Sequence, residues 1–141
     1  MIEITSKADL NRALANALHP EPPASERRAI HESGVWWWVA ASKDWPKARH
    51  ADDCIPFAGH WEPADFCGDP VASKLLRDRM RERGWWWEAG MLRGGKVLAS
   101  FTNRILDRGD GDDNEECVAF ALAALRALGV EFRLVEGWDA R

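Results

Sequence analysis

The chain has 141 residues, a formal net charge of -4 and three cysteines. A chain of this length can bury a core without disulfides or structural metals, so we expect one α+β domain over residues 1–141. The negative charge and the scattered lysines and arginines argue against direct binding to a nucleic-acid backbone. An odd number of cysteines without a CxxC pair is typical of reduced thiols rather than of a secreted disulfide framework.

The first third of the sequence predicts a helix and a strand. Ser6, followed three positions later by Asp9, has the form of a capping box, and apolar residues then share one helical stripe as far as Leu18. Residues 25–33 contain few apolar side chains, so we expect a short exposed helix or an irregular segment there. Residues 35–41 predict a strand.

Six of the nine tryptophans form two runs of three. In a strand, the middle indole of such a run points to one face and the two outer indoles point to the other. Each run therefore predicts a strand that is covered on both faces, with most of the six indoles in the core. The two runs are Trp36-Trp37-Trp38 and Trp85-Trp86-Trp87.

Residues 42–69 form a long connection, in which Pro46, Pro56 and Pro63 exclude a long helix. We expect only a short strand near residues 55–57. A connection of this length is uncommon inside a compact domain and is usually functional.

The second predicted helix follows Asp69, an N-cap residue succeeded by Pro70, and it ends at Gly84. Residues 85–92 and 96–102 then flank a pair of glycines, which predicts a hairpin with a two-residue turn. The side of the helix opposite its apolar stripe is basic and consists of Lys74, Arg77, Arg79, Arg81 and Arg83.

Residues 107–113 are polar and acidic, and we expect a solvated loop there because the residue pattern of a calcium-binding loop is absent. A third helix is predicted from Asn114 to Leu128, with Gly129 as its stop. Its apolar residues extend well beyond one stripe, so we expect it to be deeply packed. The alternating residues 130–134 predict a half-buried final strand.

The sequence contains no GxSxG, no HExxH and no glycine-rich phosphate loop, so we expect a protein without enzymatic activity. Four residues with nitrogen or sulfur ligands, His50, Cys54, His60 and Cys67, have a spacing that matches no zinc finger. We therefore expect neither a bound metal nor another cofactor.

The long connection also contains two isolated tryptophans among basic residues. Such a combination can stack on a flat ring and hold a phosphate or carboxylate, and it can equally form a hot spot for a protein partner. A purely structural role for these indoles, as the cover of a sheet edge, is the competing interpretation. The predicted ligand-binding or partner-binding residues are Trp45, Lys47, Arg49, His60 and Trp61.

From about Phe57 to Val130 the order of these signals resembles that of small phage and prophage proteins with the phage ABA sandwich domain. The resemblance rests on residues 63–72 entering a helix, the tryptophan-rich hairpin ending near Phe101, the acidic loop and the apolar run 119–130. It implies a phage origin and a three-layer sandwich, in which a central, mostly antiparallel sheet has helices on both faces. It transfers no catalytic residues.

The resemblance leads us to expect a non-catalytic phage accessory protein in the host cytoplasm, which counters antiviral defence by binding and inhibiting a host component. A sponge that sequesters a small nucleotide immune signal is the alternative, and a small nucleotide-processing enzyme is the third possibility. The expected partners are thus a host defence protein or a nucleotide. We expect no membrane contact, because no leader and no run approaching 18 apolar residues is present. An unpaired edge at the last strand or an exposed indole would favour a homodimer.

Overall fold

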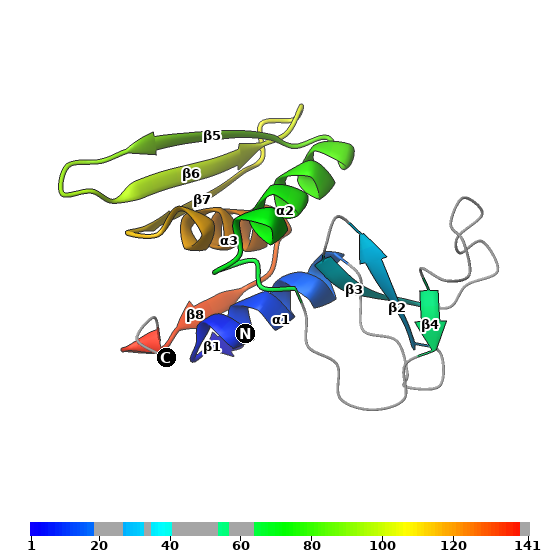
Figure 1. The fold of residues 1–141 in the computed structure, drawn as a ribbon. Coiled ribbons are helices and arrows are strands. Elements are labelled where there is room, and N and C mark those ends of the chain that lie inside the picture. The colour runs from blue at the N-terminus through cyan, green and yellow to red at the C-terminus, as the bar shows by residue number, and fades with distance from the viewer. Residues whose placement is uncertain (19–26, 33–34, 41–53, 57–63, 139–141) are drawn as a thin grey trace.

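The computed structural model describes residues 1–18, 27–32, 35–40, 54–56 and 64–138, with side chains described for 1–18 and 64–138 (Figure 1). These residues form a mixed α+β structure, which confirms the predicted class. Its helices are α1 (Lys7–Leu18), α2 (Pro70–Glu82) and α3 (Glu116–Ala127). Its strands are β1 (Ile2–Ile4), β2 (Arg27–Glu32), β3 (Val35–Ala40), β4 (Cys54–Pro56), β5 (Trp86–Met91), β6 (Val97–Thr102), β7 (Arg108–Asp113) and β8 (Phe132–Leu134).

The described strands form three small sheets. β5, β6 and β7 make an antiparallel sheet in sequence order, β1 pairs in parallel with β8, and β2 lies between β3 and β4. In Figure 1 the β5–β6–β7 sheet lies on one side of α2 and α3, whereas α1 and the β1–β8 pair lie on the other side. Helix α3 therefore packs between the sheet and α1.

Helix α3 is the centre of the core. All residues from Val118 to Leu125 are buried, which confirms the prediction of a deeply packed helix. The backbone of β7 approaches α3 so closely that a Cβ atom at Gly109 would lie 2.4 Å from the carbonyl oxygen of Ala123. Glycine on the strand and alanine on the helix make this contact possible.

The prediction of a solvated loop at residues 107–113 is wrong, because residues 108–113 form strand β7. Gly109 and Gly111 are buried against α3, while the charged residues that alternate with them, Arg108, Asp110 and Asp112, point to the other face of the sheet. In β7, glycines occupy the alternate buried positions at which a strand usually has apolar side chains, so the sequence lacks the usual strand pattern. A close helix contact thus stabilises a strand that has almost no side chains on its buried face.

The second tryptophan run is covered on one face only. Trp87, opposite Phe101 in the β5–β6 register, packs edge-on against Phe120 with ring centroids 5.2 Å apart. Trp86 points to the opposite, outer face and is 55% exposed. Among the described residues, α2 and α3 both lie on the inner face and no helix covers the outer one. The prediction that both faces of this run are covered is therefore wrong for Trp86, whereas Trp85 and Trp87 pack against the core as expected.

The predicted ends of α2 are confirmed, whereas α3 begins at Glu116, two residues after the predicted start. The Asp69 carboxylate accepts a hydrogen bond from the Val71 N–H at 2.9 Å, with Pro70 at the first helical position. At the other end of α2, Gly84 has φ 92° and the Trp85 N–H donates to the Met80 carbonyl at 3.0 Å. This is a Schellman ending, which needs a left-handed residue and leads directly into β5.

Two local predictions are wrong. Residues 27–32 form β2, paired along its length with β3, instead of a helix or an irregular segment. The β5–β6 hairpin is confirmed, but the Leu92 N–H donates to the Lys96 carbonyl at 2.6 Å, so its loop has the three residues 93–95 rather than two. In both cases the conformation depends on pairing with a neighbouring strand, which cannot be predicted from the local composition.

Candidate functional site

The five predicted binding residues, Trp45, Lys47, Arg49, His60 and Trp61, lie outside the residues that the structure describes. Of the connection 42–69, the structure describes β4, near the predicted short strand, and residues 64–69. The predicted site on this connection therefore stays a prediction.

The described part of the chain contains a different combination of an indole with basic groups. The basic side of α2 faces Trp87 across a groove of about 240 Å³, which we call the α2–β5 groove. The sequence indicates the basic helix side and the tryptophan run separately, but only the packing of α2 against β5 brings them together. The groove is lined by Lys74, Arg77, Asp78, Arg81 and Trp87.

Arg77 is the fixed cation of the groove. Its guanidinium carbon lies 5.1 Å from the centre of the Trp87 ring and 4.7 Å from the centre of the Phe120 ring. Its Nε donates to the Ser73 carbonyl at 3.4 Å, and its Nη1 lies 4.0 Å from the Glu116 carboxylate. Because the side chain is only 20% exposed, the two rings hold the charge in place with little contact with water.

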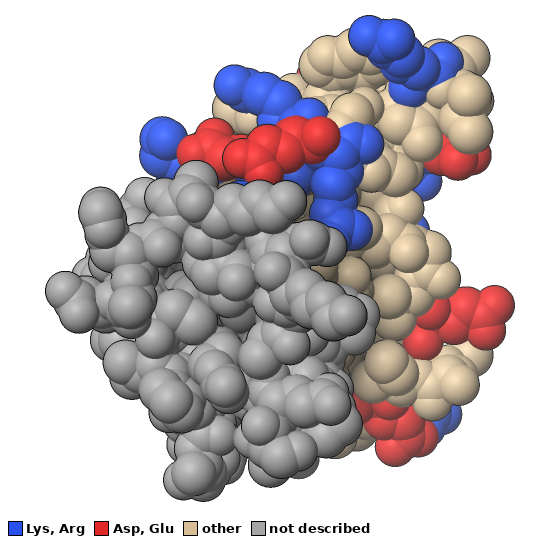
Figure 2. All heavy atoms as spheres, turned by 90° about the vertical axis from the view of Figure 1, so that its right-hand side faces the viewer, with Lys and Arg blue, Asp and Glu red and all other residues tan. Residues whose placement is uncertain are grey.

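The other two cations of the groove are more accessible. The Lys74 side chain is 72% exposed and pairs with Asp78 at 3.0 Å, and Arg81 is exposed and has no ion pair among the described residues. The face of the molecule shown in Figure 2 carries Lys and Arg side chains on both sides of a group of carboxylates. This mixture of charges suits the rim of a protein interface better than the uniform charge of a nucleic-acid backbone.

A second polar cluster lies on the outer face of the β5–β6–β7 sheet. The Ser100 hydroxyl donates to the Asp110 carboxylate at 2.6 Å, and the Arg108 Nε donates to the same oxygen at 2.7 Å. The hydrogen bond from Ser100, followed by that from Arg108, lowers the pKa of Asp110. A carboxylate with a lowered pKa is a weak base, so this arrangement serves to link β6 with β7 rather than to activate the hydroxyl.

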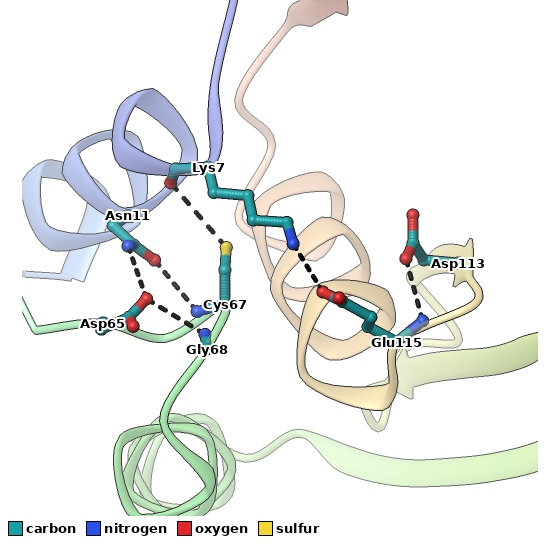
Figure 3. A network of polar contacts seen from close by, with 7 residues as sticks. All are labelled: Lys7, Asn11, Asp65, Cys67, Gly68, Asp113 and Glu115. Atoms are coloured by element: carbon teal, nitrogen blue, oxygen red, sulfur yellow. Dashed lines mark hydrogen bonds and ion pairs between the residues drawn. The ribbon is translucent and has the colours of Figure 1, made fainter. Parts of the chain in front are cut away.

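Cys67 belongs to a polar network between α1 and the start of α2 (Figure 3). Its N–H donates to the Asn11 Oδ1 at 3.1 Å, and the Asn11 amide donates to Asp65 at 3.0 Å. Burial of the thiol raises the pKa of Cys67, which keeps it protonated and makes it a poor nucleophile.

The side chains of the other three residues with nitrogen or sulfur ligands are outside the described part of the structure. His50 and His60 lie outside the described residues, and Cys54 is described only by its backbone in β4. Within the described ranges, no group of three or more metal-binding side chains comes together. In the same part of the chain, every helix is too short or too polar to cross a membrane.

Comparisons with known proteins found no relative. No protein-family model matches the chain, and neither the curated proteins nor the solved structures gave a significant match. The likeness to phage ABA sandwich proteins therefore stays a hypothesis that rests on the residues quoted for it.

Proposed function

We propose that this protein is a non-catalytic phage accessory protein that counters host antiviral defence by binding and inhibiting a host component in the host cytoplasm. The proposed binding activity rests on the α2–β5 groove. There the stacked guanidinium of Arg77 and the two exposed cations Lys74 and Arg81 border the half-buried indole of Trp87. The phage origin and the three-layer sandwich with helices on both faces rest on the resemblance of residues 57–130. Such a likeness supports a biological context and does not identify a site.

The groove fits an acidic segment of a protein. A carboxylate of the partner can approach Arg81 and Lys74 while a neighbouring apolar side chain covers Trp87, which is the usual composition of an interface hot spot. A nucleotide needs aromatic groups on its base and cations on its phosphates, and the groove offers one indole. The predicted residues Trp45 and Trp61 are the groups that a nucleotide sponge would use, so the sponge is the second candidate.

Reversing one charge in the groove tests the proposal. We expect the tagged wild-type protein to retain a host protein in stoichiometric amount from infected cells, and Arg81→Glu to weaken this binding by roughly tenfold or more, or about 1.4 kcal/mol. Arg93→Glu is the matched control, because Arg93 is also exposed but lies in the β5–β6 loop, away from the groove lining. The measurement is quantitative mass spectrometry of the retained proteins, followed by titration with the purified partner.

The outcomes separate the candidate functions. Equal loss of binding in both variants would show a general charge effect and would remove the groove from the interface. If heating releases an intact nucleotide and no host protein is retained, the protein is a nucleotide sponge and does not act by binding a host protein. Turnover of an added nucleotide in excess of the protein would show an enzyme.

A further inference from the structure

We propose that two copies of this chain associate through strand β5, which pairs antiparallel with β5 of the second copy around a two-fold axis at Ala89. The two three-stranded sheets then become one continuous sheet. The dimer does not rest on the proposed function, because neither the groove cations nor the identity of a host component is needed for it, although Trp87 belongs to both surfaces.

The two edges of the β5–β6–β7 sheet differ in protection. On the β7 edge, charged residues occupy alternate positions, and the Arg126 guanidinium donates to the Asp110 carbonyl at 2.6 Å. β5 has one charged residue, Glu88, and no proline. Natural sheets protect free edges with charges, prolines or covering groups, so within the described part of the chain β5 is the edge that lacks protection.

The hydrogen-bond pattern shows which backbone groups of β5 are available. The Leu92 N–H donates to Lys96, and hydrogen-bonded positions alternate in an antiparallel pair. Glu88 and Gly90 therefore point their backbone groups toward β6, whereas Trp87, Ala89 and Met91 point theirs away from it. On that side β5 pairs with no other described strand. Three donors and three acceptors thus form a ladder that is ready for another strand.

The sequence of β5 is complementary to itself around Ala89. An antiparallel pair centred there places Trp86 opposite the partner's Leu92 and Trp87 opposite the partner's Met91. Trp86, Met91 and Leu92 are 55%, 76% and 45% exposed, so each exposed apolar side chain of this hairpin finds an apolar neighbour. Glu88 comes opposite the partner's Gly90, which has no side chain.

The neighbouring register is less favourable. A two-fold axis at Glu88 would bring two Glu88 carboxylates directly opposite each other, and like charges at such positions destabilise a pair of strands. Only the axis at Ala89 combines the three outward backbone positions with apolar neighbours and separated charges. A second copy of the chain is therefore a better occupant of this edge than an unrelated strand.

Proline at Ala89 tests the dimer. The Ala89 N–H points away from β6, so Ala89→Pro removes an intermolecular donor and keeps the β5–β6 ladder. We expect light scattering and native mass spectrometry to give the mass of two chains for the wild type and of one chain for Ala89→Pro. Asp112→Pro is the matched control, since Asp112 has the equivalent outward position on the β7 edge, and we expect it to keep the mass of two chains.

Ala89→Lys is the second variant, in case proline disturbs the fold. Ala89 is exposed, so a lysine is tolerated in the single chain, but two ammonium groups would meet at the axis of the dimer. We expect the mass of one chain with an unchanged circular dichroism spectrum. A wild-type mass of one chain at the highest soluble concentration would overturn the proposal. So would a mass of two chains that persists in both Ala89 variants, because the dimer would then use another surface.

Discussion

At the residue scale, Gly111 is one of the two glycines at which β7 and α3 are in close contact. A Cβ atom there would lie 2.3 Å from the Ala119 carbonyl oxygen and 2.5 Å from the Ala123 nitrogen. Both are backbone atoms of a buried helix, so neither can move without displacing α3. We expect Gly111→Ala to lower the free energy of unfolding by about 1–3 kcal/mol or more, measured by urea denaturation.

Gly90→Ala is the control for this prediction. A Cβ atom at Gly90 would have no neighbour within 4 Å, and its φ is not in the left-handed region. We expect the free energy of unfolding to change by about 0.5 kcal/mol or less. Equal effects of the two substitutions would mean that β7 does not depend on the close contact with α3.

Trp86 and Trp87 show how neighbouring residues of one type differ in role. Both belong to a run for which the sequence predicts cover on both faces and most of the indoles in the core. The register of β5 with β6 instead places Trp87 against Phe120 and leaves Trp86 on the open face. The alternation of the two faces was predictable from the sequence, but the cover over each face was not, since it depends on where α2 and α3 pack.

At the element scale, the first turn of α1 couples helix stability to pH. The Asp9 carboxylate accepts hydrogen bonds from the Thr5 hydroxyl and from the Thr5 N–H, the latter at 2.9 Å. These bonds, the hydroxyl first, lower the pKa of Asp9. One half of the predicted capping box is present, because the Ser6 hydroxyl accepts a hydrogen bond from the Asp9 N–H. In the other half, the Asp9 carboxylate accepts from the Thr5 N–H instead of the Ser6 N–H.

The pKa shift determines the direction of the pH effect. A carboxyl group whose pKa is lowered by folding stabilises the protein above its unfolded pKa of about 3.9, and this contribution is lost as the pH falls through the folded value. We expect Asp9→Asn to lower the free energy of unfolding at about pH 6, by an amount that shrinks below about pH 4. Urea denaturation at a series of pH values measures both effects.

Thr5→Val provides the companion measurement. It removes the hydroxyl donor that contributes most to the shift, so it should reduce the same pH-dependent stability while leaving the carboxylate in place. If the free energy of unfolding of both variants differs from that of the wild type by the same amount at every pH, the charge of Asp9 does not contribute to the stability of α1.

At the scale of the whole molecule, Asn11 connects elements that are far apart in the sequence. Its side chain is buried, accepts a hydrogen bond from the Cys67 N–H and donates to Asp65, and so attaches α1 to the segment that enters α2 (Figure 3). Asn11→Ala leaves the buried Cys67 N–H without an acceptor. We expect a loss of about 1–3 kcal/mol in the free energy of unfolding, measured by urea denaturation.

Asn114→Ala is the corresponding control on an exposed asparagine, for which we expect a change of about 0.5 kcal/mol or less. A fully preserved stability of Asn11→Ala would indicate that water replaces the amide, and that apolar packing alone holds α1 in place.

The features that depend on local chemistry can be predicted from short stretches of the sequence. The three helices, their caps at Ser6 and Asp69, the stop at Gly84 and the β5–β6 hairpin all follow from residues within a few positions of one another, and all are confirmed. Hydrogen bonds between near neighbours and the restricted φ of proline and glycine are enough to specify them.

Other features need a contact with a segment from elsewhere in the chain and become visible only in the folded protein. β7 exists because α3 accepts its two buried glycines, and β2 because β3 and β4 lie beside it. The α2–β5 groove likewise forms only when the basic side of α2 meets Trp87. The physical reason is the same in each case: the stabilising contact lies between distant segments, so no short stretch of sequence contains it.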